Sequence, residues 1–140
     1  MLDTNACIAL INGAPAQVRS RFAQASAGGE AISTSSLVAF ELWYGVAKSA
    51  RPESNAKRLR TFLAGPIDVV TFHDDDAKYA GEIRAGLESQ GTPIGAYDLL
   101  IAGQAVRRGL TVVTANTSEF ARITGLSWED WATGESPGGH

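Results

Sequence analysis

Residues 94–120 read IGAYDLLIAGQAVRRGLTVVTANTSEF, and this stretch decides the fold. Gly95 precedes a predicted helix over residues 97–108, and Gly109 ends that helix. The run LTVVT at residues 110–114 lacks the alternation of a half-exposed strand, so it is predicted to be a strand buried on both faces. Such strands occur in parallel sheets that helices cover. The stretch therefore indicates an α/β domain.

The same alternation of helices and strands runs through the rest of the chain. Capping residues, Pro and Gly predict helices over residues 6–11, 15–25, 36–47, 52–63 and near 118, and a long helix that Asp74 caps and Gly91 closes. Strands are predicted at residues 2–4, 31–34 and 67–72 and around residue 128. We expect a three-layer α/β/α domain with a central, mostly parallel sheet over residues 1–131. Residues 132–140, rich in Gly, are expected to form a flexible tail.

Length and composition exclude several classes of protein. The chain has 140 residues, of which 44% are apolar and 19% charged, a balance that fits one globular domain and excludes disorder. Its apolar runs are far shorter than the ~20 residues that a membrane-spanning helix needs. Cys7 is the only cysteine, so an internal disulfide and a structural zinc site are excluded. We expect a soluble, cytoplasmic protein.

Charge is unevenly distributed along the chain. The formal net charge is −3, so no bulk basic field marks the protein as a nucleic-acid binder. Residues 19–60 nonetheless hold seven Lys and Arg against three Glu, whereas the remaining residues hold five basic side chains against twelve acids. Residues 19–60 therefore form either a surface that binds phosphate groups or an ordinary solvated helix face.

Four carboxylates are candidates for chemistry. Asp3 lies at the end of the first predicted strand and Glu119 just after the strand at residues 110–114, and ligands of parallel sheets bind beyond the carboxyl ends of the strands. Asp3 is equally well explained as a helix N-cap, and Glu119 as an acid that a helix dipole favours. Glu41 and Asp98 lie on helix faces that otherwise point inward, with no Lys or Arg one turn away. Burying a lone charge is costly, so a partner is expected for both.

A divalent cation fits these acids better than a cationic side chain from elsewhere in the fold. Carboxylates that converge on one crevice repel each other, and a hard cation relieves that repulsion. Oxygen ligands alone suit Mg²⁺ or Mn²⁺, which polarise phosphoryl groups and activate water for phosphodiester hydrolysis. No nucleophile triad, GxSxG or P-loop string competes, and the only histidines are His73 and His140. His73 is expected at the surface, at the end of a strand.

Two other classes of magnesium-dependent α/β protein fit less well. A phosphatase of the haloacid dehalogenase type has a second Asp two residues after the first, where this chain has Asn5. A response-regulator receiver needs an early acid pair and a late lysine, and the chain offers neither beside the triplet Asp74, Asp75 and Asp76. We interpret that triplet as a helix cap and dipole partner.

Four segments carry a family resemblance. They are LDTN at residues 2–5, SLVAFELWYG at 36–45, IGAYDLLIAGQA at 94–105 and LTVVTANTSEF at 110–120. Each motif alone is unspecific, but all four in this order resemble a PIN-domain ribonuclease, and most of all the VapC-type toxins. The closing GLSWEDW at residues 125–131 is similar to that group as well, so the resemblance covers residues 2–131.

The resemblance implies a Mg²⁺- or Mn²⁺-dependent endoribonuclease whose metal ligands match Asp3, Glu41 and Asp98. The fourth acid of the family falls in TANTSEF, where many members have an aspartate near position 116. This chain has Asn116 there and Glu119 after it, so the fourth ligand stays open between them. The resemblance also implies supporting residues that hydrogen-bond the carboxylates or metal-bound water, namely Thr4, Asn5, Ser36, Thr114 and Asn116.

The resemblance implies partners as well. The substrate is expected to be a structured RNA such as transfer RNA. Attack of water on its backbone would leave 5′-phosphate and 3′-hydroxyl ends, and loss of the RNA would arrest translation. Trp43 and Tyr44 are expected to pack in the core rather than stack on bases. A homodimer is implied, as is a VapB-type antitoxin that blocks the acidic crevice with a basic side chain. The alternative is a catalytically silent PIN-like module that docks a DNA-binding partner. Contacts to the RNA backbone are expected from Arg19, Arg21, Lys48, Lys57 and Arg58.

Overall fold

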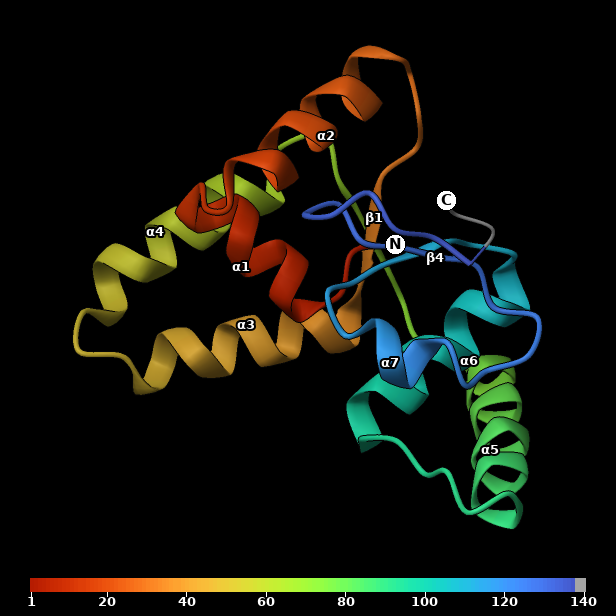
Figure 1. Cartoon of the computed structure of the whole chain (residues 1–140). Helices are drawn as coiled ribbons and strands as arrows, with labels where there is room; N and C mark the ends of the chain where they lie inside the picture. Colours follow the sequence, from red (N-terminus) through yellow and green to blue (C-terminus); the bar gives the residue numbers. More distant parts are fainter. Residues whose placement is uncertain (138–140) are drawn as a thin grey trace. The chain divides into compact units, whose positions relative to one another are not determined.

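A computed structural model describes residues 1–137 of the chain. It contains short parallel strands and the helices that connect them (Figure 1). The structure divides into two compact units. The first unit is Leu2–Thr71, and the second unit is Met1 with the residues from Phe72 onward. Residues 138–140, which include His140 and the end of the predicted tail, lie outside the described residues.

The first unit holds four helices and two strands among its described elements. The strands β1 and β2 pair in parallel with Ser33 opposite Asp68, and Leu2 forms an isolated parallel bridge with Thr34. Leu2 and Thr34 are fully buried, so this bridge lies in the core of the first unit. The elements are α1 (Thr4–Asn12), α2 (Ala16–Ala27), β1 (Ser33–Ser35), α3 (Ser36–Lys48), α4 (Pro52–Leu63) and β2 (Asp68–Val70).

Local sequence explains where these helices begin and end. Asp3 Oδ1 accepts a hydrogen bond from Ala6 N at 2.9 Å and caps α1, which therefore begins at Thr4, earlier than predicted. Ser35 Oγ accepts a hydrogen bond from Leu37 N at 3.0 Å and caps α3 in the same way. Gly13 ends α1 with a φ of 71°, a left-handed conformation that favours glycine.

The second unit follows the same plan. The strands β3 and β4 pair in parallel with Val112 opposite Trp128, and Val113 N donates a hydrogen bond to Met1 O at 2.8 Å. The core of this unit contains Ile101 and Phe120. Its elements are α5 (Asp74–Ser89), α6 (Ala96–Arg108), β3 (Val112–Val113), α7 (Thr117–Phe120) and β4 (Trp128–Glu129).

Two contacts join α5 closely to α6. A Cβ atom added to Gly103 would lie 2.6 Å from Ala80 N, so only glycine allows this approach of the two helices. The fully buried Asp76 carboxylate accepts hydrogen bonds from Arg107 Nε and from Arg108 Nη2, the latter at 3.3 Å. Asp76 Oδ2 also accepts a hydrogen bond from His73 N at 2.8 Å. The exposed His73, rather than the predicted Asp74, is therefore the N-cap residue of α5.

Helices and parallel strands confirm the predicted α/β class. The strands are shorter than predicted, because Leu110 N donates to Ala105 O in the turn that ends α6 and leaves only Val112–Val113 in β3. None of the described helices is long and apolar enough to cross a membrane. Within the predicted tail, Gly134 N donates to Asp130 O at 2.7 Å. The flexibility of residues 132–140 stays a prediction.

Candidate functional site

In the first unit, the predicted acids Asp3 and Glu41 both contact the N-terminal end of α1. Asp3 follows the bridge residue Leu2, is buried, and caps α1. Glu41 lies on α3, and its Oε1 accepts a hydrogen bond from Thr4 Oγ1 at 2.5 Å. Thr4 is the first residue of α1, so the cap that starts the helix also places the hydroxyl that holds Glu41.

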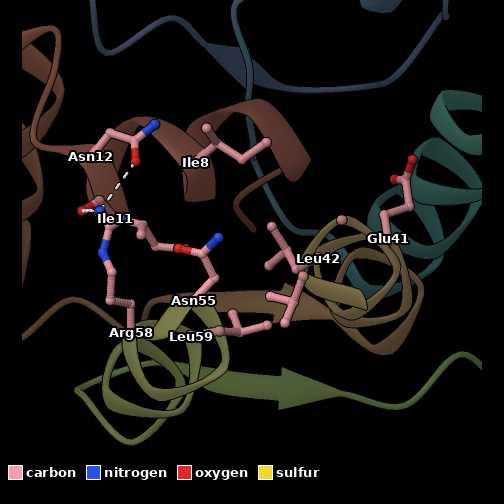
Figure 2. Close-up of a pocket in the computed structure, with 10 residues that line it drawn as sticks. Ile8, Ile11, Asn12, Glu41, Leu42, Asn55, Arg58 and Leu59 are labelled. Carbon is pink, nitrogen blue, oxygen red and sulfur yellow. Dashed lines mark hydrogen bonds between the residues drawn. The ribbon is translucent and has the colours of Figure 1, made fainter. Parts of the chain in front are cut away.

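A groove of about 290 Å³ lies between α1, α3 and α4 in the same unit (Figure 2). Aliphatic side chains line it, among them Ile8, Leu42 and Leu59. Glu41 lies at one end in the view of Figure 2, and Arg58 lies at the other. Arg58 Nη2 donates hydrogen bonds to Ile11 O at 3.1 Å and to the side chain of Asn12, so it holds α4 against the end of α1. The groove therefore has an apolar wall and ends of opposite charge.

In the second unit, Asn116 brings two of the predicted acids together. Its Nδ2 donates hydrogen bonds to Asp98 Oδ2 at 2.8 Å and to Glu119 Oε2. Glu119 Oε1 accepts a further hydrogen bond from Gly95 N at 3.0 Å, at the N-cap of α6. Asp98, Asn116 and Glu119 are the Asn116 cluster.

The environment of Glu119 favours its charged form. The hydrogen bond with the Asp98 carboxyl group holds the pKa of Glu119 below its ordinary value, and burial acts in the opposite direction. The amide of Gly95 and the side chain of Asn116 add to the lowering because they donate to the carboxylate. The cluster therefore presents a carboxylate rather than a neutral acid at neutral pH.

The strand β3 anchors the Asn116 cluster. Thr114, which follows β3, is buried, and its backbone N donates to Glu129 O on β4 at 3.0 Å. Thr114 Oγ1 accepts a hydrogen bond from Asn116 N at 2.9 Å. The sheet thus fixes the backbone of Asn116 through one buried hydroxyl, and the amide side chain fixes the two carboxylates in turn.

The prediction that Glu41 and Asp98 are buried charges is wrong. Glu41 and Asp98 are half-exposed, so they do not carry the desolvation cost expected of buried charges. Asp76 does carry that cost, and two arginines compensate for it. Gly95, whose amide holds Glu119, escaped sequence reasoning, since a backbone donor has no sequence signal of its own.

The remaining predicted residues lie in varied surroundings. Ser36 begins α3 but Ser35 caps it, and Asn5 is exposed in the first turn of α1. The expectation that Trp43 and Tyr44 pack in the core is wrong, because their exposed fractions are 37% and 59%. Their face of α3 is open because the buried side of that helix is formed by Val38 and Leu42.

Most of the predicted RNA-contacting cations have partners within the first unit. Arg21 pairs with Glu30 at 3.7 Å, and the Lys48 ammonium lies 4.7 Å from the centre of the Tyr44 ring. Arg19 packs against Gly13, where a Cβ atom would lie 2.7 Å from its Nη2. Lys57 is exposed, and Arg58 belongs to the groove.

The donor set suits a hard cation. Asp3, Glu41, Asp98 and Glu119 offer carboxylate oxygens, the ligands that Mg²⁺ and Mn²⁺ prefer. Within neither unit do three His, Cys, Asp or Glu side chains of the described residues form a metal-binding cluster. Burial raises the pKa of Cys7 to about 12, so its thiol stays protonated and is no ligand. Each unit therefore supplies carboxylates held by a neutral side chain, Thr4 or Asn116.

Comparison with known proteins places the chain in a family. The PIN domain family matches residues 1–126. The tRNA(fMet)-specific endonuclease VapC of Shigella flexneri is 46% identical over 132 residues, which cover 94% of this chain and 97% of the relative. Ribonuclease VapC2 of Rickettsia felis is 40% identical and covers 94% of this chain and 96% of the relative.

Solved structures agree with the sequence relatives. VapBC2 from Rickettsia felis, bound to a DNA fragment from its promoter, matches with a TM-score of 0.86 and 40% identity over 94% of this chain and 97% of that chain. DNA-bound VapBC from Salmonella typhimurium matches with a TM-score of 0.85 and 43% identity over 94% of this chain and 96% of that chain. Each alignment spans nearly the whole of this chain and nearly the whole of the other chain. The chain therefore belongs to the PIN domain family and, within it, to the VapC group.

Proposed function

We propose that the protein is a metal-dependent endoribonuclease toxin that cuts structured RNA, with transfer RNA as the first candidate. The observation that carries the proposal is the pair of side-chain clusters built on the acids of the family resemblance. Thr4 holds Glu41 beside the helix that Asp3 caps, and Asn116 holds Asp98 and Glu119. Relatives that match along nearly their whole length are named endonuclease and ribonuclease. Cleavage of RNA would take place in the cytoplasm.

The proposed reaction is the attack of water on an RNA phosphodiester, leaving 5′-phosphate and 3′-hydroxyl ends. The proposed ligands of Mg²⁺ or Mn²⁺ are Asp3 and Glu41 in the first unit, and Asp98 with Glu119 as the fourth carboxylate in the second unit. The chemistry that such an ion supplies is polarisation of the phosphoryl group and a lower pKa for water. The protein's own contribution is orientation, because Thr4 fixes one carboxylate before substrate arrives and Asn116 fixes two.

The proposed protein partner is a VapB-type antitoxin whose chain occupies the groove of the first unit. VapBC complexes from relatives support a partner of this kind. The aliphatic wall suits the apolar face of an amphipathic segment, Glu41 suits a basic side chain and Arg58 suits an acidic one. Ile8→Glu should weaken the complex without loss of fold, because Ile8 is exposed in the groove. Val69→Glu is the matched control, an exposed aliphatic residue on β2 that does not line the groove.

A homodimer is also proposed. The exposed aromatic face of α3, formed by Phe40, Trp43 and Tyr44, is an apolar surface that a second copy would cover. Sedimentation of the wild type and of Tyr44→Glu tests this, since loss of an aromatic contact should shift the protein toward monomer. An unchanged sedimentation coefficient would remove this face from the proposal.

The nuclease is tested with purified, antitoxin-free protein and total RNA in Mg²⁺, Mn²⁺ or chelator, followed by mapping of the 5′ ends. Asp3→Asn is the matched inactive variant, because Asn caps a helix as well as Asp does and the fold should survive. Discrete metal-dependent cuts that the variant does not make would support the proposal. Absence of cutting from folded protein in every condition would favour the catalytically silent binding module instead.

A further inference from the structure

Arg122 differs from the other basic side chains of the second unit. Residues 72–137 hold ten acidic and five basic residues, so negative charge dominates this unit. Four of the basic side chains form salt bridges with carboxylates, namely Lys78, Arg84, Arg107 and Arg108. Among the described residues of this unit, Arg122 is the one basic residue outside these salt bridges, and it is exposed.

The contacts of Arg122 leave most of its guanidinium available to a ligand. Its Nη1 donates a hydrogen bond to Pro93 O at 2.9 Å. A guanidinium carries five N–H groups, so this bond uses a small part of its donor capacity. The carbonyl is uncharged and does not neutralise the arginine. The hydrogen bond with Asp98 is the main cause of the lowered pKa of Glu119, and the charge of Arg122 adds to it, so Arg122 lies near that acid.

Two hydrogen bonds join the segment before α6 to the α7 region. One is the bond from Arg122, and the other runs from Gly95 N to Glu119 Oε1 at 3.0 Å. Tyr97 follows Gly95 by two residues and directly precedes Asp98 in the first turn of α6. Its exposed fraction is 44%, although aromatic side chains are usually buried. The two joined segments therefore present a cation and an exposed ring on either side of the predicted acids in the sequence.

We propose that Arg122 and Tyr97 form a nucleotide subsite beside the Asn116 cluster, where Arg122 binds a phosphate of the RNA backbone and Tyr97 stacks on an unpaired base. The inference rests on the proposed function for RNA as the ligand. It adds substrate contacts in the second unit, whereas the predicted RNA-contacting cations all belong to the first.

The chemistry of the two side chains fits one nucleotide. The planar guanidinium matches the oxygens of a phosphate group, and its charge attracts the RNA backbone to a unit that is otherwise acidic. Every base has a face that can stack on an aromatic ring, but a base inside a duplex is already stacked on its neighbours. The subsite therefore favours an unpaired nucleotide over a duplex.

The probe for the test is a fluorescein-labelled oligouridylate, which is single-stranded. We would measure its binding to the full chain by fluorescence anisotropy across a titration with NaCl, in chelator so that metal-dependent cleavage does not consume it. Arg122→Gln should reduce the slope of log affinity against log salt by about 0.7, because one phosphate contact of a single strand is lost. Tyr97→Ala should weaken binding about tenfold with the wild-type slope, and Tyr97→Phe should bind as the wild type does.

Matched controls lie on α5 of the same unit. Arg84→Gln makes the same change of charge at an exposed arginine that pairs with Glu88, and Tyr79→Ala removes a tyrosine with an exposed fraction of 38%. Both should follow the wild type in affinity and in slope. Arg122→Lys keeps the charge and should keep the wild-type slope. Melting temperatures from circular dichroism check the fold of every variant.

The outcomes separate an RNA contact from a structural role. A wild-type salt slope for Arg122→Gln, or wild-type affinity for Tyr97→Ala, would overturn the proposal, as would a wild type that does not bind the probe. If Arg122→Lys loses as much slope as Arg122→Gln, Arg122 acts through its bond to Pro93 and the phosphate contact is refuted. A wild type that binds the probe as expected but cuts no RNA with Mn²⁺ would refute the proposed function and leave the subsite intact.

Discussion

Replacing Asp76 tests the ion pair that joins α5 to α6. The Asp76 side chain has 0% exposure, and it accepts hydrogen bonds from His73 N, Arg107 Nε and Arg108 Nη2. Both arginine side chains are 25% exposed, so water partly solvates them when their partner is removed. The perturbation therefore removes the carboxylate from two arginines that remain partly solvated.

The magnitude follows from the hydrogen bonds that are lost. Removing one partner of a fully buried ion pair costs about 3–5 kcal/mol, and solvent screening of exposed arginines lowers that cost. In Asp76→Asn the amide oxygen still accepts from His73 N, whereas Asp76→Ala loses that bond as well, worth about 1 kcal/mol. We expect the free energy of unfolding to fall by about 2 kcal/mol for Asp76→Asn and about 3 kcal/mol for Asp76→Ala.

The same pair makes stability depend on pH. Burial raises the pKa of Asp76, but hydrogen bonds from Arg107, His73 and Arg108 outweigh burial and hold the pKa below its ordinary value. The pair therefore stabilises the protein above the unfolded pKa of about 3.9, and that contribution disappears as the pH falls through the lower folded pKa. Asp76→Asn should lack this part of the loss in acid.

Urea unfolding followed by circular dichroism at pH 7 and in a series down to pH 3 measures both effects. Asp75→Asn is the matched control, because Asp75 is the exposed neighbour in the same helical turn. If Asp76→Asn unfolds at the same urea concentration as Asp75→Asn, the ion pair does not stabilise the α5–α6 contact. If the acid dependence of Asp76→Asn equals that of the wild type, the depressed pKa is assigned to the wrong group.

Three further perturbations test the packing, the site and the buried thiol. Gly103→Ala should lower the free energy of unfolding by about 1–3 kcal/mol in urea melts, because its Cβ would meet Ala80 N at 2.6 Å. Gly86→Ala is the control, and it should not destabilise the protein because the space around Gly86 is open. Thr4→Val should reduce the rate of RNA cleavage about tenfold, because it removes the hydroxyl that donates to the Glu41 carboxylate. Thr4→Ser retains a hydroxyl and should cleave RNA at the wild-type rate. Because burial raises its pKa to about 12, Cys7 should resist thiol reagents at pH 8 in the native protein and react once urea unfolds the chain. Fast reaction of the native protein would contradict the burial of Cys7.

Local signals in the sequence account for most of the helix boundaries. Proline at the first position predicts Pro52 as the start of α4, and the structure has α4 at Pro52–Leu63. The predicted strand at residues 110–114 retains only Val112–Val113, because the hydrogen bond from Leu110 N to Ala105 O takes Leu110 out of the strand. Periodicity locates a buried run, but pairing partners decide how much of it is strand.

Contacts between distant parts of the chain were beyond prediction. Asp76 was interpreted as a cap residue, and its partners Arg107 and Arg108 lie 31 and 32 positions away. The helical face of Asp98 was predicted to be buried, but an N-terminal first-turn position leaves its carboxylate half-exposed. The resemblance names Asn116 as a supporting residue, but only the fold shows that its amide donates to Asp98 and to Glu119.

Cleavage of RNA by Asp98→Asn tests the central claim most directly. The substitution keeps the size of the side chain and removes the charge from a half-exposed acid, so the fold should survive. Asp75→Asn, at an exposed acid in the same unit, makes the same chemical change as a control. With total RNA and Mn²⁺, we predict discrete cuts by the wild type and Asp75→Asn, none by folded Asp98→Asn, and none by any of them in chelator. Equal cutting by Asp98→Asn and the wild type, or cutting by the wild type in chelator, would contradict a metal-dependent nuclease built on these acids.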